Sequence, residues 1–261
     1  MHVTVFASGS SGNCLLLSDH ETHILIDAGI SVRRITSDLA RAGLTWRKIE
    51  GVLITHEHSD HILALKTLIR HENTPIFAPR TVANRLRGMF PGIEEQLVEI
   101  PVGTSFSLGR LRIRAFHTPH DTDESVGYRV EGTGIFALAT DMGEVTEEIW
   151  NGLSGAHTVL LESNHDVERL RLGPYPASLK LRILSSHGHL SNADCAALAR
   201  RLAENGTRRL ILGHLSRENN SPALALDAAG AALTGLQTAV CCAPEDGFLV
   251  VPVEGESPCC L

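Results

Sequence analysis

The chain has 261 residues, of which 43% are hydrophobic and 20% are charged, so it can bury a sizeable core without disulfides. No run of residues approaches the ~20 apolar positions that a membrane-spanning helix needs, and the first residues lack a signal-peptide pattern, so we expect a cytoplasmic protein. The net charge of −7 argues against a broad basic surface for nucleic acid, although bound divalent ions would add positive charge at a site.

The first third of the chain alternates strands with helices. In chain order, the predicted elements are strands at 3–7, 14–17 and 23–26, a helix at 31–42, a strand at 51–54 and a helix at about 60–70, and strands continue to alternate with helical stretches up to Arg87. Ser31 is a favourable N-cap for the first helix, and Gly43 is a favourable stop. The strand at 51–54 leads directly into His56.

Strands dominate the middle of the chain, and the mixed pattern then returns. The middle strands are predicted at 97–100, 105–108, 111–116, 125–131 and 134–139. The second half has a strand at 158–162, helices near 176–184 and 192–205, a strand at 208–213, a helix at 222–233 and two closing strands. Strand clusters mixed with helices in both halves predict one α/β domain over residues 1–261, an αββα sandwich of two mixed sheets flanked by helices.

Six cysteines are present, and none forms a C-x-x-C pair. Two pairs are directly adjacent, Cys241 with Cys242 and Cys259 with Cys260, which is a poor arrangement for disulfides or a zinc knuckle. We expect reduced thiols, with the last pair on a mobile tail.

The strongest pattern is the H-x-H-x-D-H motif at residues 56–61, which follows an apolar strand and begins a helix. His56 and His58 are spaced to point to the same side and share one ion. Asp60 and His61 turn toward a second ion where the helix begins. The alternative is a solvated loop that happens to be rich in histidine, but four ligands in this register at a strand end disfavour it.

Two further candidate ligands stand directly after predicted strands, where α/β folds build their sites. Asp141 follows the strand at 134–139, and its two oxygens could bridge two ions. His214 follows the strand at 208–213. Each has a simpler alternative: a turn aspartate for Asp141, and a buried, hydrogen-bonded histidine for His214.

The remaining ligand is expected from residues 116–121, which offer both His117 and His120. Spacing does not choose between them, and we prefer His120 because it lies deeper in the loop, past Pro119. The predicted centre then has two ligand sets joined by Asp141 and a water. The sets are His56, His58 and His120 for one ion, and Asp60, His61 and His214 for the other.

Imidazole and carboxylate ligands together suit two divalent ions, which we expect to be zinc or manganese. Two such ions about 3.5–4 Å apart lower the pKa of a bridging water toward 7, so hydroxide forms at neutral pH. Asp60 could orient that hydroxide as well as bind metal. The predicted reaction is therefore hydrolysis. No organic cofactor is expected, because a dinucleotide-binding glycine pattern is absent.

The pattern of Asp27, the motif at 56–61, His120, Asp141 and His214 is similar to the metallo-β-lactamase superfamily over essentially the whole chain. The resemblance implies an αββα sandwich with a dinuclear site at its edge. It also implies that Asp27 holds the metal-binding loop by hydrogen bonds without touching metal. Aspartate rather than cysteine at position 141 resembles the phosphodiester and thioester hydrolases of the superfamily.

Further stretches resemble the YycJ (WalJ) branch of that superfamily. They lie at residues 8–13, 119–121, 162–166, 173–176, 188–192, 213–216 and 219–220. This resemblance supports His120 over His117. It implies a dinuclear phosphodiesterase that acts as a 5′→3′ exonuclease, on DNA in preference to RNA.

Four side chains in these stretches are candidate substrate contacts: Asn13, His165, His189 and Asn219. Asn13 could donate its amide to a phosphate oxygen or simply hold its turn. His165 and His189 could give a proton to the leaving oxygen, with Asp60 as the third catalytic residue, or could pair with a carboxylate. Asn219 could line the cleft or cap the next helix.

Two other functions remain open. The chain could hydrolyse a small ester, thioester, lactone or cyclic nucleotide, which would show as cleavage that is indifferent to salt. It could also be a metal-binding scaffold without activity, although every expected ligand is present.

Overall fold

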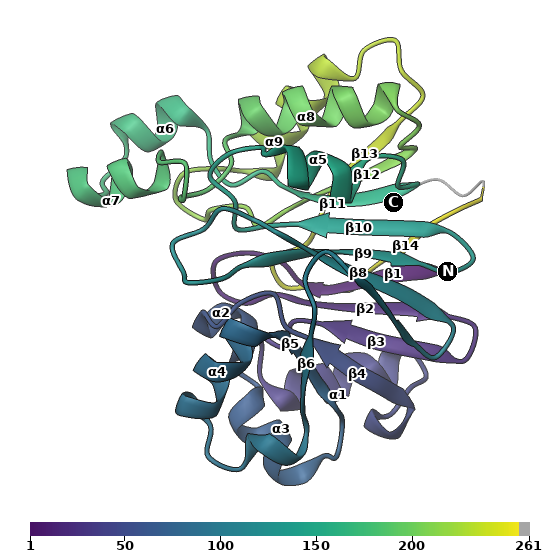
Figure 1. Ribbon diagram of the computed structural model, residues 1–261. Helices are drawn as coiled ribbons and strands as arrows, with labels where there is room; N and C mark the ends of the chain where they lie inside the picture. The colour runs from purple at the N-terminus through teal and green to yellow at the C-terminus, as the bar shows by residue number, and fades with distance from the viewer. Residues whose placement is uncertain (256–261) are drawn as a thin grey trace.

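The computed structural model describes residues 1–255, in which two seven-stranded mixed sheets lie face to face between layers of helices (Figure 1). The first sheet has the strand order β14 (Leu249–Pro252), β1 (His2–Ala7), β2 (Cys14–Asp19), β3 (Thr22–Ile26), β4 (Ile49–Leu53), β5 (Ile76–Pro79) and β6 (Leu97–Ile100). The second has the order β13 (Ala239–Cys242), β12 (Arg209–Gly213), β11 (Thr158–Glu162), β10 (Ile135–Ala139), β9 (Val126–Glu131), β8 (Leu111–His117) and β7 (Ser105–Leu108). The predicted αββα sandwich is confirmed.

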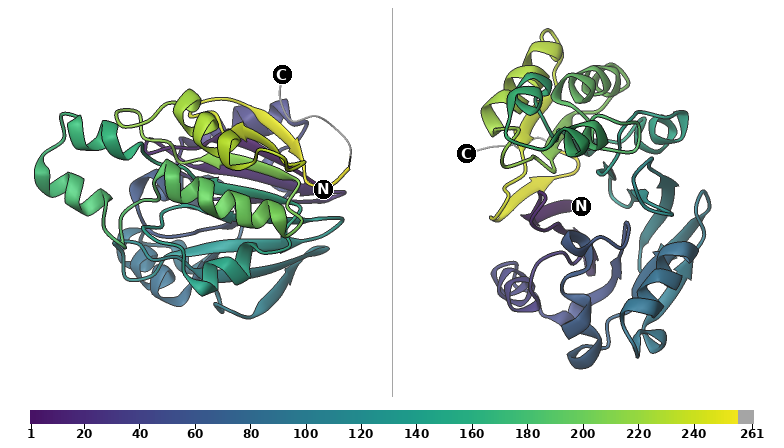
Figure 2. Two further views of the ribbon diagram at one scale, coloured as in Figure 1. Left: turned by 90° about the horizontal axis from the view of Figure 1, so that it is seen from above. Right: turned by 90° about the vertical axis from the view of Figure 1, so that its left-hand side faces the viewer.

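The helices divide between the two outer faces. The first sheet is covered by α1 (Val32–Arg41), α3 (Leu65–His71) and α4 (Arg80–Met89), and the second by α5 (Glu147–Leu153), α8 (Asn192–Glu204) and α9 (Pro222–Ala232) (Figure 1). The shorter elements are α2 (Ser59–Ile62), α6 (Val167–Leu172), α7 (Ala177–Ile183) and the 3₁₀ turns η1 (Trp46–Lys48) and η2 (Ile93–Glu95). The pair α6 and α7 stands out from the body at one end of the sheets (Figures 1 and 2).

The sandwich explains why the strands read as nearly continuous apolar runs. Successive side chains of a strand point to opposite faces of the sheet, and here both faces are covered. In β2, Leu15 and Leu17 enter the core between the two sheets, while Leu16 packs under the helices with Ile35 and Leu39 of α1.

The prediction of one helix at about 60–70 is wrong in one respect, because the structure has two helices there, α2 and α3. Neighbouring backbone uses the groups that would continue the helical ladder. The carbonyl of Asp60 accepts from the amide of Asn13 at 2.8 Å, and the carbonyl of His61 accepts from Ala28 at 2.8 Å. The amide of Ala64 donates to the carbonyl of Ala28 at 2.9 Å. These bonds fix the metal-binding motif against the loop after β3.

Two helices were not predicted from the sequence, α5 and α6. Both are short, with seven and six residues, and both begin at a side-chain N-cap. Thr146 accepts from the amide of Ile149, and Asp166 accepts from the amide of Arg169. These caps are the sequence signal that could have revealed the helices.

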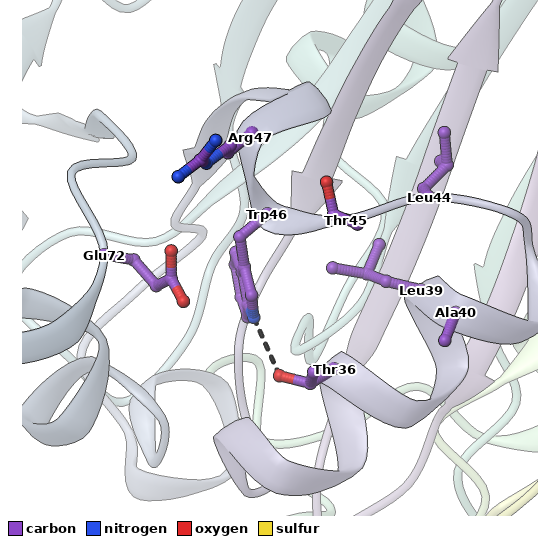
Figure 3. Close-up of a pocket in the computed structure, with 8 residues that line it drawn as sticks. All are labelled: Thr36, Leu39, Ala40, Leu44, Thr45, Trp46, Arg47 and Glu72. Carbon is purple, nitrogen blue, oxygen red and sulfur yellow. Dashed lines mark hydrogen bonds between the residues drawn. The ribbon is translucent and has the colours of Figure 1, made fainter.

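A hollow of about 510 Å³ lies beside α1 and η1, at the opposite end of β4 from His56 (Figure 3). The indole of Trp46 donates to Thr36 at 2.8 Å there, and no candidate metal-ligand group of the described residues lies in it.

Among the residues that the structure describes, no helix is long and apolar enough to cross a membrane. Cys14 and Cys195 are buried thiols, whereas Cys259 and Cys260 lie outside the described residues.

Candidate metal centre

The predicted ligands converge because the strands that precede them end at one edge of the sandwich. In the first sheet, β3 and β4 are parallel, and they lead into Asp27 and the motif at 56–61. In the second sheet, β10, β11 and β12 are parallel, and they lead into Asp141, Glu162 and His214. Parallel strands present their carboxyl ends at the same edge, so loops from both sheets meet there.

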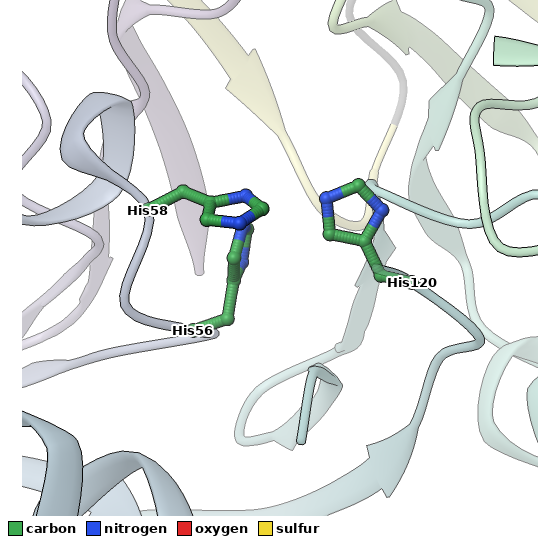
Figure 4. Close-up of side chains that lie close together, drawn as sticks. All are labelled: His56, His58 and His120. Atoms are coloured by element: carbon green, nitrogen blue, oxygen red, sulfur yellow. The ribbon is translucent and has the colours of Figure 1, made fainter. Parts of the chain in front are cut away.

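The first ligand set consists of three histidines whose rings lie close together, edge to face (Figure 4). His56 and His58 come from the motif after β4, and His120 comes from the loop after β8. The ring centroids of His56 and His58 are 4.6 Å apart, and each is 5.1 Å from the centroid of His120. The three rings offer ligand atoms within 4.8 Å of one another.

The second ligand set, Asp60, His61 and His214, lies beside the first. Asp141 stands between the sets: its Oδ2 is 3.3 Å from Nε2 of His61, and its Oδ1 is 3.6 Å from Nε2 of His120. Oδ1 of Asp141 is also 3.5 Å from Nε2 of His214. One carboxylate therefore reaches both sets, the position that a bridging ligand needs.

Hydrogen bonds at Nδ1 turn the Nε2 atom of each buried ring toward the centre. The partner of His61 is Asp27 at 2.8 Å, that of His120 is the carbonyl of Gly188 at 3.2 Å, and that of His214 is Glu162 at 2.9 Å. Such contacts fix the tautomer and orientation of metal-binding histidines. Asp27 also accepts from the amide of Thr55 at 2.9 Å, so it ties the strand end to the motif.

The donors fit divalent metal ions. Nε2 of His56 and Nε2 of His214 are buried and have no hydrogen-bond partner among residues 1–255. A buried nitrogen without a hydrogen-bond partner destabilises the fold unless a ligand binds to it. The sets contain imidazole and carboxylate but no thiolate, which are donors that divalent metal ions accept.

Carboxylates and imidazoles in this cluster shift one another's pKa. Burial raises the pKa of Asp141, but His214 and His61 outweigh it and hold that pKa well below its ordinary value. Burial lowers the pKa of His214, but the surrounding carboxylates, led by Asp141, raise it to about 10. A metal ion that binds here must therefore displace a proton from His214.

His120 and His117, which the sequence left as alternatives, have different surroundings. His120 is 5% exposed and lies among the other rings. His117 is exposed, and its Nδ1 pairs with Glu148 at 3.1 Å while its Nε2 lies 3.4 Å from Glu124. Only His120 joins the candidate metal groups of the described residues.

Of the four candidate substrate contacts, only His189 is partly open, with 23% of its side chain exposed. Asn13 is buried, and its amide nitrogen lies 3.1 Å from Nε2 of His61 and 3.4 Å from Oδ2 of Asp60. Asn219 is fully buried, and its amide nitrogen lies 3.4 Å from the hydroxyl of Ser216. The side chains of Asn13 and Asn219 are thus buried and contact other residues of the protein.

His165 is also buried, and neither ring nitrogen has a hydrogen-bond partner within residues 1–255. Burial lowers the pKa of His165 to about 4, so the ring is neutral at pH 7. It belongs to none of the candidate metal groups of this part of the chain. Its role as a substrate contact stays a prediction.

Glu162 is a functional candidate that the residue patterns alone did not single out. Its Oε1 accepts from Nδ1 of His189 at 2.8 Å and from Nδ1 of His214 at 2.9 Å, while Oε2 accepts from the amide of Met142 at 2.9 Å. It follows the strand-end rule of the other ligands, because it is the last residue of β11. Glu162 is fully buried, and its hydrogen bonds link His189 to His214 of the metal centre.

Comparisons with known proteins agree with this geometry. Residues 22–215 match the family model of the β-lactamase superfamily domain. The chain is 37% identical over 227 residues to the exodeoxyribonuclease YycJ of Bacillus anthracis, covering 86% of each chain. It is 37% identical over 228 residues to the exodeoxyribonuclease WalJ of Streptococcus pneumoniae, covering 85% of this chain and 84% of the relative.

Solved structures support the fold alone. The metallo-β-lactamase fold protein YhfI from Bacillus subtilis superposes with a TM-score of 0.73 at 15% identity, covering 96% of this chain and 99% of that one. Zn²⁺-bound PqqB from Methylobacterium extorquens gives a TM-score of 0.71 at 19% identity, covering 97% of this chain and 100% of that one. With two thirds or more of each relative's sequence covered, this chain belongs to the metallo-β-lactamase superfamily, in the branch that contains YycJ and WalJ.

Proposed function

We propose that this chain is a metal-dependent phosphodiesterase that removes nucleotides from the 5′ end of DNA. The observation that carries the proposal is the meeting of two ligand sets at Asp141. It occurs in a chain that is 37% identical to proteins named exodeoxyribonucleases over most of both lengths.

Seven side chains would hold two divalent ions, zinc or manganese: His56, His58, His120, Asp60, His61, His214 and Asp141. When bound, such a pair of ions supplies Lewis acidity to a phosphoryl oxygen and lowers the pKa of water. The remaining work belongs to the side chains, which orient the attacking water and move protons.

Asp60 is the base that we assign to the attacking water. Its Oδ2 is 3.4 Å from Nε2 of His61 and 3.6 Å from Nε2 of His214. Burial raises the pKa of Asp60, but the nearby imidazole rings of His214 and His61 outweigh it and lower that pKa below its ordinary value. Asp60 is therefore ionised at neutral pH and accepts a hydrogen bond from water.

His189 is the acid that we assign to the leaving oxygen. Burial lowers the pKa of His189, but the bond from its Nδ1 to Glu162 outweighs it and raises that pKa. The ring therefore holds its proton at higher pH than an ordinary histidine. Because His189 is the partly open member of this pair, it is placed to give a proton to an oxygen that leaves phosphorus.

The test is cleavage of 5′-phosphorylated single- and double-stranded DNA with zinc or manganese, comparing wild type with Asp60→Ala. We expect stepwise release of nucleotides by the wild type. Loss of the proposed base should lower the rate by roughly 10²–10⁴-fold without unfolding the protein. Exposed Asp227 in α9 provides the matched control, since Asp227→Ala makes the same change away from the site.

Undiminished cleavage by Asp60→Ala, or its unfolding at room temperature, would contradict the assignment of Asp60. An absence of DNA cleavage by wild type with either metal would contradict the exonuclease. Hydrolysis of a small phosphodiester or ester, indifferent to salt, would then be the function to test.

A further inference from the structure

The helices α6 and α7 form an arm whose two ends are fixed at the metal centre. The chain leaves β11 at Glu162 and comes back at His189, and both of these residues belong to the site. The amide of Asn164 donates to the carbonyl of Leu190 at 2.9 Å, so the outgoing and returning segments are joined at the base. Beyond that base, α6 and α7 project from the body (Figures 1 and 2).

The arm is basic in an acidic chain. Residues 167–184 contain four basic side chains and one acidic side chain, Glu168, whereas the whole chain has a net charge of −7. The basic residues are Arg169, Arg171, Lys180 and Arg182. A local positive charge beside a site for phosphodiesters favours a polyanionic substrate.

Between the arm and the body lies a hollow of about 180 Å³. Tyr175, Leu179 and Arg182 line it from the arm, and Asn164 and His189 line it from the body. The hollow is smaller than the ~300–1,000 Å³ of drug-sized ligand sites, so it can enclose part of a single nucleotide but not a duplex. An aromatic ring, an arginine and the proposed acid therefore share one small space.

Two prolines hold the backbone of Tyr175. Pro174 and Pro176 fix their own φ angles and restrict the residue that precedes each of them to extended conformations. Pro176 is also the N-cap residue of α7, so the helix begins two residues after the tyrosine. A backbone that is already held in place loses less conformational entropy when a ligand binds against it.

Arg182 connects the hollow to the metal centre. Its guanidinium pairs with Asp121 through Nε and Nη2, and Oδ1 of Asp121 is 3.2 Å from Nε2 of His120. The third guanidinium nitrogen, Nη1, has no partner among the described residues, and 60% of the side chain is exposed. Arginine in this setting can offer its remaining donors to a phosphate.

We propose that this hollow binds the 5′-terminal nucleotide of the DNA, with its base stacked on Tyr175 and a phosphate oxygen on Arg182. The inference rests on the proposed exonuclease function. In that reaction water attacks phosphorus, the bond from phosphorus to O3′ of the terminal nucleotide breaks, the water gives up a proton and O3′ gains one. Since His189 lines the hollow, the nucleotide beside it is the one that leaves.

Stacking on an aromatic ring tolerates every base, so Tyr175 should select for the presence of a base and not for its identity. The test compares oligonucleotides that carry either a normal or an abasic 5′-terminal nucleotide. We expect wild type to prefer the normal end by about tenfold in kcat/KM. The same preference should appear in the affinity for 3′-labelled DNA, measured by fluorescence anisotropy without added metal.

Tyr175→Ala should abolish that preference, and Tyr175→Phe, which keeps the ring, should restore it. Arg182→Ala should raise KM and reduce the slope of log affinity against log salt by about 0.7, the value for one phosphate contact on a single strand. The matched control is Arg208→Ala, because Arg208 is exposed just before β12, at the opposite end of that strand from His214, and should change neither quantity.

The outcomes separate the two proposals. A tenfold preference that persists unchanged in Tyr175→Ala would overturn the terminal-nucleotide site while leaving the exonuclease intact. Wild type that neither cleaves nor binds the normal oligonucleotide would overturn both. Loss of the preference in Tyr175→Ala with recovery in Tyr175→Phe would support the site, because a merely structural tyrosine would change both substrates equally.

Discussion

Three residues at the metal centre adopt a backbone conformation that is uncommon for residues other than glycine. Asp27, Asp141 and His214 have φ angles of 59°, 56° and 55°. Each follows a strand by one or two residues, so the left-handed turn redirects the chain where the strand ends. Such conformations cost free energy, and they cluster where the surroundings hold a functional side chain in place.

Sequence could predict the residue types at this centre but not every contact. The motif at 56–61 and the strand-end residues Asp141 and His214 are predicted as ligands because loops at strand ends build the sites of α/β folds, and the structure brings these side chains together. Spacing could not separate His117 from His120. That choice depends on Glu148 and Glu124, which pair with His117 in the folded protein. Spacing likewise could not show that Asn13 is buried, because its burial depends on the folded structure.

The first prediction concerns Glu162→Gln. The carboxylate accepts from His189 and His214 through one oxygen and from the Met142 amide through the other. An amide side chain must turn its NH2 either toward the two imidazoles or toward the backbone amide of Met142, so in either orientation a donor opposes a donor and the hydrogen bonds that hold the rings are disturbed. We expect metal affinity to fall by roughly 10–100-fold, as measured by competition with a chelator.

The matched control for Glu162→Gln is Glu148→Gln. Glu148 also pairs with a histidine, His117 at 3.1 Å, but this pair is exposed and lies outside the ligand sets. Its substitution should leave metal affinity unchanged. Equal losses in the two variants would mean that the bond from Glu162 does not orient the metal-binding rings.

At the scale of elements, the strands were predicted more closely than the helices. The bounds of β6, β7 and β11 agree with the predicted 97–100, 105–108 and 158–162, because short segments in which apolar residues run together or alternate between turn residues define strands. The break between α2 and α3 could not be predicted. It arises from backbone hydrogen bonds to Asn13 and Ala28, which are distant in the sequence.

The packing of the loop after β3 against the metal-binding motif leads to the second prediction. A Cβ atom on Gly29 would lie 1.6 Å from the carbonyl oxygen of Asp60 and 2.7 Å from the amide nitrogen of Asn13. Both contacts are with backbone, so Gly29→Ala must displace the motif. We expect metal affinity and thermal stability to fall together, measured by chelator competition and by the unfolding midpoint.

Gly88 provides the control for Gly29. It lies in α4, and a Cβ atom there would meet nothing within 4 Å. Gly88→Ala should therefore leave metal affinity unchanged and raise stability slightly, by up to ~1 kcal/mol, because alanine favours a helix more than glycine does. Normal metal binding by Gly29→Ala would contradict the close approach of these two loops.

For the molecule as a whole, neither sheet alone holds a complete site. The first sheet supplies the motif at 56–61 and Asp27, while the second supplies His120, Asp141 and His214. The αββα class followed from the order of predicted elements. The strand order could not be predicted in this way. The pairing of β14 with β1 joins the two ends of the described chain, and the local sequence pattern carries no information on such distant contacts.

The third prediction concerns a buried contact between the sheets. Asp19 ends β2 of the first sheet, and Thr133 lies in the turn between β9 and β10 of the second. The fully buried Asp19 carboxylate accepts from the amide of Thr133 at 2.9 Å and from its hydroxyl at 2.7 Å. Burial raises the pKa of Asp19, but these bonds outweigh it and lower that pKa below its ordinary value.

A carboxylate whose pKa is lowered by folding stabilises the protein above its unfolded pKa of about 3.9, and this stabilisation is lost as pH falls through the folded value. Asp19→Asn should therefore cost roughly 1.5–3 kcal/mol of unfolding free energy at pH 7, the usual strength of hydrogen bonds to a charged group. The difference from wild type should shrink below about pH 4, as measured by urea unfolding across that range. The exposed Asp227→Asn change should have no such effect. A difference that stays constant as the pH falls would show that Asp19 acts through shape and not through its charge.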